Sequence, residues 1–203
     1  QDLIEREENE KSYLTPNGIN TAEYHITIPI DKRNKYTISL LNHWQERKDL
    51  PTAFAALDIV KRKYPQLKVL IFGEQEKPTL PDWYQYYRRP SQTLHIEINN
   101  RAAIYVGSSK IEGFGLTIGE AMLCGQAVAC TDNLGYQEMA KHEKTALLSR
   151  VGDYGALALN IIRLIEDDDL RFRLAQTGHD YVRDHFSWKR AHQEFDKALN
   201  VEE

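Results

Sequence analysis

The chain is poor in cysteine and has no long hydrophobic run. Only Cys124 and Cys130 occur among its 203 residues, and neither has the Cys or His spacing of a zinc site. Their apolar surroundings predict two buried, reduced thiols, as is usual in a cytoplasmic protein. No signal peptide is recognisable, and no apolar run approaches the roughly 20 residues that span a bilayer. We therefore expect a cytoplasmic domain without a transmembrane segment or structural zinc.

Positive charge is also scarce. The 26 Lys and Arg residues are outnumbered by 30 Asp and Glu residues, which gives a formal net charge of −4. Proteins that bind nucleic acid usually carry a basic excess or stripe, so no nucleic-acid partner is expected and any phosphate site must be local. With 41% hydrophobic residues the chain is long enough to bury the core of one domain. Its start at Gln1 in a charged stretch is compatible with a fragment of a longer protein.

Short apolar runs alternate with amphipathic segments along most of the chain. Runs at 35–42, 67–72, 102–106, 126–130 and 145–149 predict buried strands, with helices expected at 50–64, up to 124, and at 136–141. The alternation predicts an α/β fold with a Rossmann-like, doubly wound parallel sheet. Three C-terminal helices are expected at about 153–166, 168–184 and 187–199. Ligands bind such sheets beyond the carboxyl ends of the strands.

Residues 112–120 (EGFGLTIGE) carry the clearest chemical signal. Gly113 and Gly115 allow backbone N–H groups to approach a ligand, and the start of the following helix attracts an anion. Glu112 and Glu120 beside such a site make sense if hydroxyl groups flank a phosphate. Thr117 and Glu120 also fit a helix capping box, in which Glu120 needs no ligand. The pattern alone permits both interpretations, but Glu112, which has no capping role, and the two glycines favour the ligand interpretation.

Arg47 and Lys48 precede the helix at 50–64, at the same predicted edge of the sheet. Asp49 is a suitable N-cap for this helix, and Pro51 is tolerated in its first turn. Two helix N-termini and a lysine could therefore converge on one diphosphate, with the lysine acting as a point charge.

Two other stretches have competing interpretations. Segment 78–91 contains an aromatic and basic cluster: Trp83, Tyr84, Tyr86, Tyr87, Arg88 and Arg89. The aromatic rings either pack on the sheet from a loop helix or stack on a nucleobase, and packing is the favoured interpretation. A weak strand is expected near Leu94. Asp167–Asp169 contain an Asp-x-Asp pattern typical of some metal sites, but their place between two helices favours a helix cap, and no metal is implied.

Residues 107–135 (GSSKIEGFGLTIGEAMLCGQAVACTDNLG) closely resemble the donor-binding signature of retaining GT-B glycosyltransferases of the "glycosyl transferases group 1", or family four, type. The resemblance extends to 16–20, which is similar to the hinge motif, to Glu138, to 145–148, to Asp153 and to 186–188. It implies one half of a GT-B architecture: a tail or linker at 1–20, and a domain at 21–203 that binds a nucleotide sugar.

The resemblance also implies roles for individual residues. Glu112 would contact the donor sugar hydroxyls and Glu120 the ribose, while Lys48 would neutralise the leaving diphosphate. Donor contacts would further come from Gly113, Phe114, Gly115, Leu116, Thr117, His43 and Arg47, and no metal or other cofactor is implied. The sequence departs from the family at Asn42-His43, where a Gly-Arg pair is usual, at Asp49, where glycine is usual, and at Ser108, where proline is usual.

The implied activity is transfer of a hexose from a nucleoside-diphosphate sugar to an acceptor hydroxyl with retention of configuration, in bacterial polysaccharide or cell-surface glycan biosynthesis. A glycan or lipid-linked acceptor would bind an N-terminal domain that is absent here, so the isolated chain is expected to be inactive. The full-length protein is expected to be cytoplasmic, at the inner membrane face. The alternatives are a non-catalytic scaffold that binds sugar nucleotide and, third, a sugar-nucleotide epimerase of the same architecture.

Overall fold

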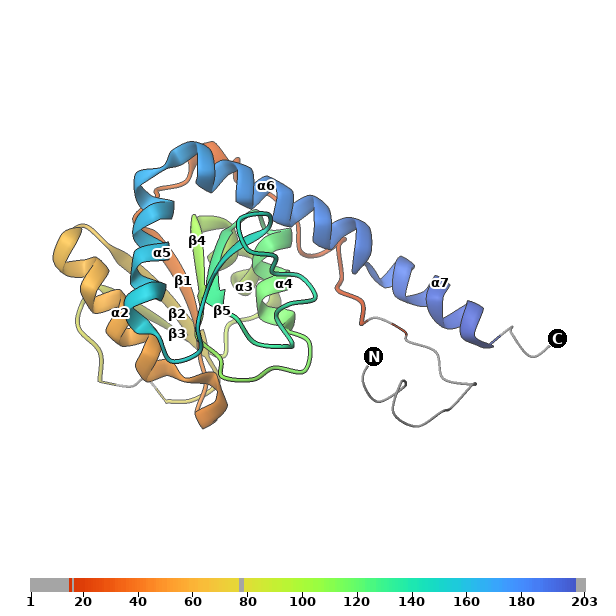
Figure 1. Cartoon of the computed structure of the whole chain (residues 1–203), viewed down its shortest axis with the longest axis horizontal. Helices are drawn as coiled ribbons and strands as arrows, with labels where there is room; N and C mark the ends of the chain where they lie inside the picture. Colours follow the sequence, from red (N-terminus) through yellow and green to blue (C-terminus); the bar gives the residue numbers. More distant parts are fainter. Residues whose placement is uncertain (1–14, 16, 77–78, 200–203) are drawn as a thin grey trace.

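One parallel sheet with helices on both faces forms the body of the molecule (Figure 1). The structure, a computed structural model, describes residues 15, 17–76 and 79–199. The strands are β1 (Thr37–Asn42), β2 (Lys68–Gly73), β3 (Tyr84–Arg88), β4 (Ile104–Gly107), β5 (Ala127–Thr131) and β6 (Ala146–Ser149). Their order is β3-β2-β1-β4-β5-β6, with every pairing parallel. The predicted doubly wound sheet is confirmed.

The helices divide between the two faces. The helical segments are η1 (Ile30–Lys32), η2 (Glu46–Lys48), α2 (Leu50–Lys63), α3 (Gln92–Arg101), α4 (Leu116–Leu123), α5 (Tyr154–Glu166), α6 (Asp168–His185) and α7 (Trp188–Leu199). Alternate strand residues enter two buried clusters: Ile38 and Ile71 face α2 and α5, while Phe72 and Tyr105 face α3 and α4. This period of two is what strands covered on both faces produce.

Two local predictions are wrong. The aromatic segment 84–88 is not a loop helix but the edge strand β3, on which Tyr84 packs edge-on against Phe54 of α2. The residues around Leu94 form helix α3 instead of a strand. Hydrophobic periodicity does not reveal this helix because its buried face carries Asn99 and Asn100.

The expected helix at 136–141 is also wrong, since residues 134–139 form consecutive turns and residues 140 and 141 are not helical. The Thr145 hydroxyl donates to the Met139 carbonyl at 2.6 Å and accepts the Lys141 N–H at 2.8 Å. The side chain thus takes backbone groups that a helix would need. The other expected strands and helices are confirmed within a few residues at their ends.

The buried Arg33 side chain connects the segment that precedes β1 to the rest of the domain. The Arg33 guanidinium donates to the carbonyls of Ile28, Ala102 and Cys124 at 2.7, 3.2 and 2.6 Å, and to the Asn100 side chain at 3.2 Å. Burial lowers the pKa of Arg33 to about 10. Cys124 and Cys130 are free and buried, as expected.

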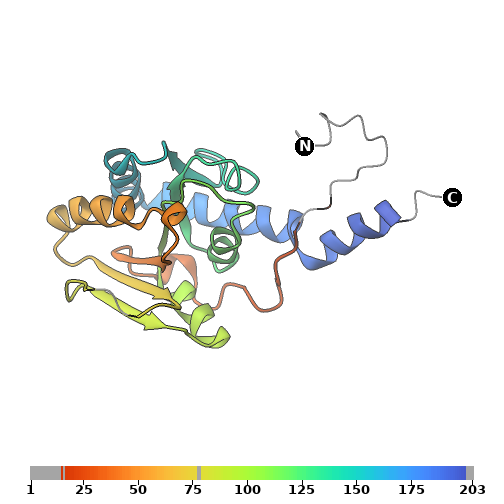
Figure 2. The ribbon, with the colours of Figure 1, turned by 90° about the horizontal axis from the view of Figure 1, so that it is seen from below.

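Helix α7 extends beyond the sheet (Figure 2) and buries none of its residues. The Trp188 indole donates to the Gly18 carbonyl at 3.1 Å. Within the described residues, no helix combines the length and the apolar character needed to cross a membrane. Most of the expected tail at 1–20 lies outside the described residues, and the division at residue 20 stays a prediction.

Candidate functional site

A short loop after β1 presents two cations at the carboxyl edge of the sheet. We call residues 43–49 the β1 arm; it contains Arg47 and Lys48 in η2 and ends at Asp49, the N-cap of α2. Asp49 has φ 48° and ψ 48°, the left-handed region that glycine adopts without strain and aspartate tolerates. Its side chain does not cap the helix backbone as expected but accepts the Thr52 hydroxyl at 2.7 Å. The backbone conformation therefore explains why glycine is usual here, and Asp49 preserves it.

The loop after β4 presents the carboxylate. We call residues 108–115 the β4 arm, and two of its donors bond to backbone carbonyls of the β1 arm. The Ser108 hydroxyl donates to the Lys48 carbonyl at 2.9 Å, and the Lys110 N–H donates to the Arg47 carbonyl at 2.7 Å. Because β1 and β4 are neighbours where the strand order reverses, the two arms meet at the topological switch point, the usual ligand crevice of such sheets.

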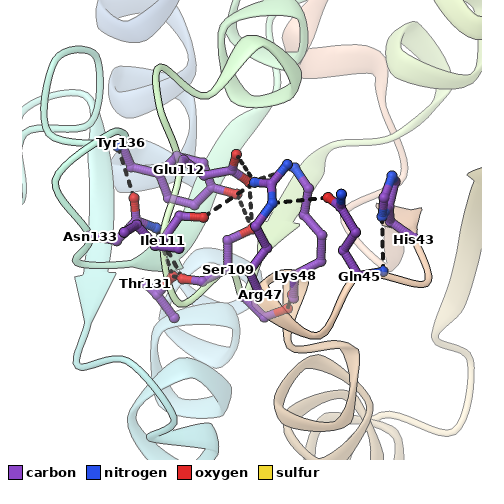
Figure 3. A network of polar contacts seen from close by, with 11 residues as sticks. His43, Gln45, Arg47, Lys48, Ser109, Ile111, Glu112, Thr131, Asn133 and Tyr136 are labelled. Atoms are coloured by element: carbon purple, nitrogen blue, oxygen red, sulfur yellow. Dashed lines mark hydrogen bonds and ion pairs between the residues drawn. The ribbon is translucent and has the colours of Figure 1, made fainter.

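Glu112 forms an ion cluster with both cations of the β1 arm (Figure 3). Glu112 Oε1 lies 2.6 Å from Lys48 Nζ, and Glu112 Oε2 lies 3.0 Å from Arg47 Nη1. The Glu112 and Lys48 side chains are only 7% and 13% exposed, whereas Arg47 is 42% exposed. Burial raises the pKa of Glu112, but hydrogen bonds from Lys48, Ser109 and Arg47 outweigh it, so the pKa lies below its ordinary value. The cluster holds a carboxylate where a bound anion could compete for the same cations.

His43 supplies a neutral donor beside this cluster. Its Nδ1 accepts the Gln45 N–H at 3.1 Å, and its ring stacks on Trp44 with centroids 6.0 Å apart. Burial, followed by the positive charges of Lys48 and Arg47, lowers the pKa of His43. At neutral pH the ring is therefore uncharged, with its remaining proton on Nε2. An arginine would add a positive charge that this histidine lacks.

The two loop glycines have different structural reasons. Gly115 has φ +89° as the N-cap of α4, and a Cβ there would lie 2.7 Å from the Tyr136 ring. A Cβ on Gly113 would meet nothing within 4 Å. The backbone of Gly113 is thus open to an approaching group, whereas Gly115 is required by conformation and packing.

The capping-box interpretation of Thr117 and Glu120 is wrong. Helix α4 begins at Leu116 with Gly115 as its N-cap, so Thr117 lies inside the first turn, and no side chain caps the helix. Glu120 is instead partly buried on α4. Burial raises its pKa to about 7, and a hydrogen bond from the Tyr24 hydroxyl opposes this rise. Among the described residues, no hydrogen bond joins Glu120 to the Glu112 cluster. Phe114, in the β4 arm, packs edge-on against Phe186 with ring centroids 5.6 Å apart.

Sequence reasoning missed the residues that support Glu112 from behind. The Ser109 hydroxyl donates to Glu112 Oε1 at 2.7 Å and accepts the Tyr136 hydroxyl at 3.1 Å. The Ser109 carbonyl accepts the Thr131 hydroxyl at 2.6 Å and the Asn133 amide at 3.0 Å (Figure 3). Polar residues directly after β4 and β5 were the available signal, because parallel strands end at one edge.

The aromatic segment 78–91 and the acidic run Asp167–Asp169 both have structural roles. Trp83 packs on Tyr84 with centroids 3.9 Å apart, and the Tyr86 hydroxyl donates to the Gln75 carbonyl at 2.6 Å, so these aromatic residues are held in and around the edge strand β3. Asp167 accepts the Leu170 N–H at 2.8 Å as the N-cap of α6, which confirms the helix-cap interpretation. Asp168 pairs with Arg171 at 2.8 Å.

The family model for "Glycosyl transferases group 1" matches residues 23–181. The chain belongs to this family. "Putative glycosyltransferase EpsD" of Bacillus subtilis is 27% identical in an alignment of 185 positions that covers 79% of this chain and 47% of that protein. The chain thus spans about half the length of this curated relative.

Several solved structures share this fold. The C-terminal domain of the glycosyl transferase group 1 family protein LpcC from Francisella tularensis matches with a TM-score of 0.73 and 21% identity, over 84% of this chain and 100% of that one. Anabaena HepE, solved in complex with UDP-glucose, matches with a TM-score of 0.76 and 18% identity, over 90% of this chain and 55% of that one. The group 1 chain therefore has the fold of a GT-B glycosyltransferase domain.

Proposed function

We propose that this chain is the donor-binding half of a retaining glycosyltransferase that moves a hexose from a nucleoside-diphosphate sugar to an acceptor hydroxyl. The observation that carries the proposal is the cluster of Arg47, Lys48 and Glu112 at the β1–β4 switch point. It combines cations that suit a diphosphate with a carboxylate that suits sugar hydroxyls. Family membership and the UDP-glucose complex of HepE support the same donor class.

Binding would exchange partners within this cluster. The diphosphate takes Lys48 and the more exposed Arg47 from Glu112, and backbone N–H groups of Gly113, Phe114, Gly115, Leu116 and Thr117 at the start of α4 add donors. The open backbone at Gly113 permits this approach. Glu112 then accepts hydroxyls of the donor sugar, and Glu120 accepts those of the ribose.

Lys48 carries the main electrostatic task during transfer. As the bond to the sugar breaks, negative charge accumulates on the departing nucleoside diphosphate, and a fixed cation stabilises it. His43 contributes one neutral N–H in place of a guanidinium. The sugar is attacked on the face from which the diphosphate leaves, so its configuration is retained, and no metal takes part.

The acceptor is proposed to bind a second, N-terminal domain. The chain accounts for 47% of EpsD, which leaves room for such a domain in a longer protein. The name of EpsD and the family as a whole fit assembly of a bacterial polysaccharide or cell-surface glycan on a glycan or lipid-linked acceptor. The chain alone is expected to bind nucleotide and to transfer little or no sugar.

Calorimetry tests donor binding with UDP, GDP and ADP and their glucose conjugates. We expect the wild-type chain to bind one nucleotide pair, and Lys48→Met to weaken both members by at least tenfold. Lys63→Met is the matched control, because Lys63 forms an equally short ion pair, 2.6 Å from Glu166, at an exposed site on α2. Absence of binding to all six compounds would contradict the proposal.

The neutral state of His43 favours a second candidate, a non-catalytic module that binds a sugar nucleotide for scaffolding. Glu112→Gln in the longer protein separates the two. Loss of sugar transfer with intact nucleotide binding supports the enzyme. Unchanged function of the longer protein supports the scaffold.

A further inference from the structure

The geometry points to Ser109 and Tyr136 as positioning residues that keep Glu112 directed at the donor sugar after the diphosphate has taken Arg47 and Lys48. This inference rests on the proposed function and adds two residues to its site. Neither residue contacts the donor in this scheme, and both act through the Glu112 carboxylate.

The partners of Glu112 come from two sides. Lys48 and Arg47 reach it from the β1 arm, across the crevice, and Arg47 is the most exposed member of the cluster. Ser109 reaches Oε1 at 2.7 Å from within the β4 arm itself. A diphosphate can compete for the cations, because an anion binds them as the carboxylate does. It cannot compete for Ser109, whose hydroxyl is buried with the rest of the residue.

Ser109 is fixed in one orientation by four hydrogen bonds. Its carbonyl accepts Thr131 and Asn133, and its hydroxyl oxygen accepts the Tyr136 hydroxyl at 3.1 Å. Since a serine hydroxyl has a single proton, receiving the Tyr136 proton directs its own proton to Glu112. The result is an ordered relay from Tyr136 through Ser109 to Glu112 Oε1 (Figure 3).

Tyr136 is itself held by the backbone around the site. A Cβ on Gly107, at the end of β4, would lie 3.1 Å from the Tyr136 hydroxyl, and one on Gly115 would lie 2.7 Å from its ring. The ring is 2% exposed, and burial raises the pKa of its hydroxyl well above the ordinary value, so it remains a donor. The glycine before the β4 arm and the glycine that ends it thus make room for the ring that starts the relay.

Loss of the relay should therefore affect recognition of the sugar and spare that of the nucleotide. With Arg47 and Lys48 engaged by phosphate, Glu112 retains one fixed hydrogen bond at Oε1 and presents Oε2 to a sugar hydroxyl. Without the Ser109 hydroxyl, the Glu112 carboxylate can turn away from the sugar and toward Arg47 and Lys48. The contribution of the sugar to binding is then lost, while the phosphate contacts remain.

The test compares Ser109→Ala and Tyr136→Phe with two buried controls. Ser149→Ala removes a hydroxyl at the end of β6 that bonds only weakly, at 3.4 Å, to the Cys130 carbonyl. Tyr84→Phe removes a buried hydroxyl that has no hydrogen-bond partner among the described residues. Each chain is titrated with the one of UDP, GDP and ADP that the wild type binds most tightly, and with its glucose conjugate. Thermal melting checks that each variant is folded.

We expect Ser109→Ala to reduce the preference for the glucose conjugate over the nucleotide by about fivefold to tenfold, roughly the net value of an ordinary hydrogen bond. Tyr136→Phe should reduce it two- to threefold, and both controls should leave it unchanged. Nucleotide affinity should stay within twofold throughout. Without nucleotide, carboxyl-carbon NMR should show the pKa of Glu112 raised in both relay variants and unchanged in the controls.

Three outcomes would overturn the relay. One is an unchanged preference in both relay variants, and another is an equal loss of affinity for nucleotide and conjugate, which indicates a structural role only. The third is a wild-type chain that does not distinguish the two ligands. If the wild type binds no compound, the proposed donor function fails, and the NMR titration alone then decides whether the relay holds Glu112.

Discussion

Replacing Lys48 by methionine removes one ammonium group and leaves Glu112 as a poorly compensated buried charge. Lys48 Nζ lies 2.6 Å from Oε1, and the two side chains are 13% and 7% exposed. Breaking a buried ion pair from one side costs about 3–5 kcal/mol. Because Arg47 and Ser109 still contact the carboxylate, we expect the free energy of unfolding to fall by about 1–2 kcal/mol at pH 8. In a chain of this size that lowers the melting temperature by roughly 2–8 °C.

The loss should depend on pH in a defined direction. The pKa of Glu112 is lower in the folded wild type than the ordinary 4.5, so its stabilising contribution is present above pH 4.5 and is lost as pH falls through the folded value. In Lys48→Met, the ammonium group that opposes the effect of burial is gone, so the pKa of Glu112 rises. The carboxylate then destabilises the variant at pH 8, and protonation relieves it at lower pH. The difference between wild type and variant should shrink from pH 8 to pH 4.5.

Urea unfolding at pH 4.5, 6 and 8, followed by far-UV circular dichroism, measures this difference. The double variant Lys48→Met/Glu112→Gln carries no uncompensated carboxylate and should recover most of the loss at pH 8. Lys63→Met, at the exposed pair with Glu166, should be indistinguishable from wild type. A Lys48→Met deficit of equal size at pH 4.5 and 8 would refute the reasoning, as would a double variant no more stable than the single one.

Four further substitutions test stability or binding at single positions. Gly115→Ala should cost about 2 kcal/mol, because φ is +89° and the new Cβ meets Tyr136, whereas Gly113→Ala should melt like wild type but bind nucleotide more weakly in calorimetry. Arg33→Met should cost about 3 kcal/mol or more in urea unfolding, since it leaves buried carbonyls without donors; an unchanged midpoint would contradict this. Glu120→Gln should stabilise the chain at pH 8 by on the order of 2 kcal/mol and have little effect at pH 4. Because the pKa of Glu120 is raised in the folded chain, ionisation of its carboxyl group lowers the stability of the wild type as pH rises from about 4.5 to 7. A stabilisation of equal size at both pH values would show that Glu120 is not responsible.

The sequence predicts the sheet and the meeting of the two arms because both follow from simple patterns. Apolar runs separated by helical segments leave few arrangements other than a parallel doubly wound sheet. Once the strands are assigned, Lys48 and Glu112 must lie at one edge. Their direct contact needs the strand order, which places β1 beside β4 and which no local pattern contains.

The sequence predictions are wrong where polar groups or glycine determine the local structure. Helix α3 is hidden by Asn100, whose amide bonds Thr27, His25 and Ile96 in the interior instead of contributing an apolar position. The capping box fails because Gly115 in the left-handed region starts α4 before Thr117. Ser109 has only its place just after β4 as a sequence signal, and Tyr136 has none. Their importance comes from an approach of β4, α4 and the loop after β5 that only the folded chain creates.

The position of the ion cluster between β1 and β4 also makes it a marker of folding order. Lys48 and Glu112 are 64 residues apart in the chain and meet only when the central strand pair closes. Such distant pairing is slow compared with formation of the surrounding helices. A nucleotide added during refolding would therefore bind only molecules whose central strands have joined, and its signal would time that event. At equilibrium the same ligand would add RT ln(1 + [L]/Kd) to the free energy of unfolding.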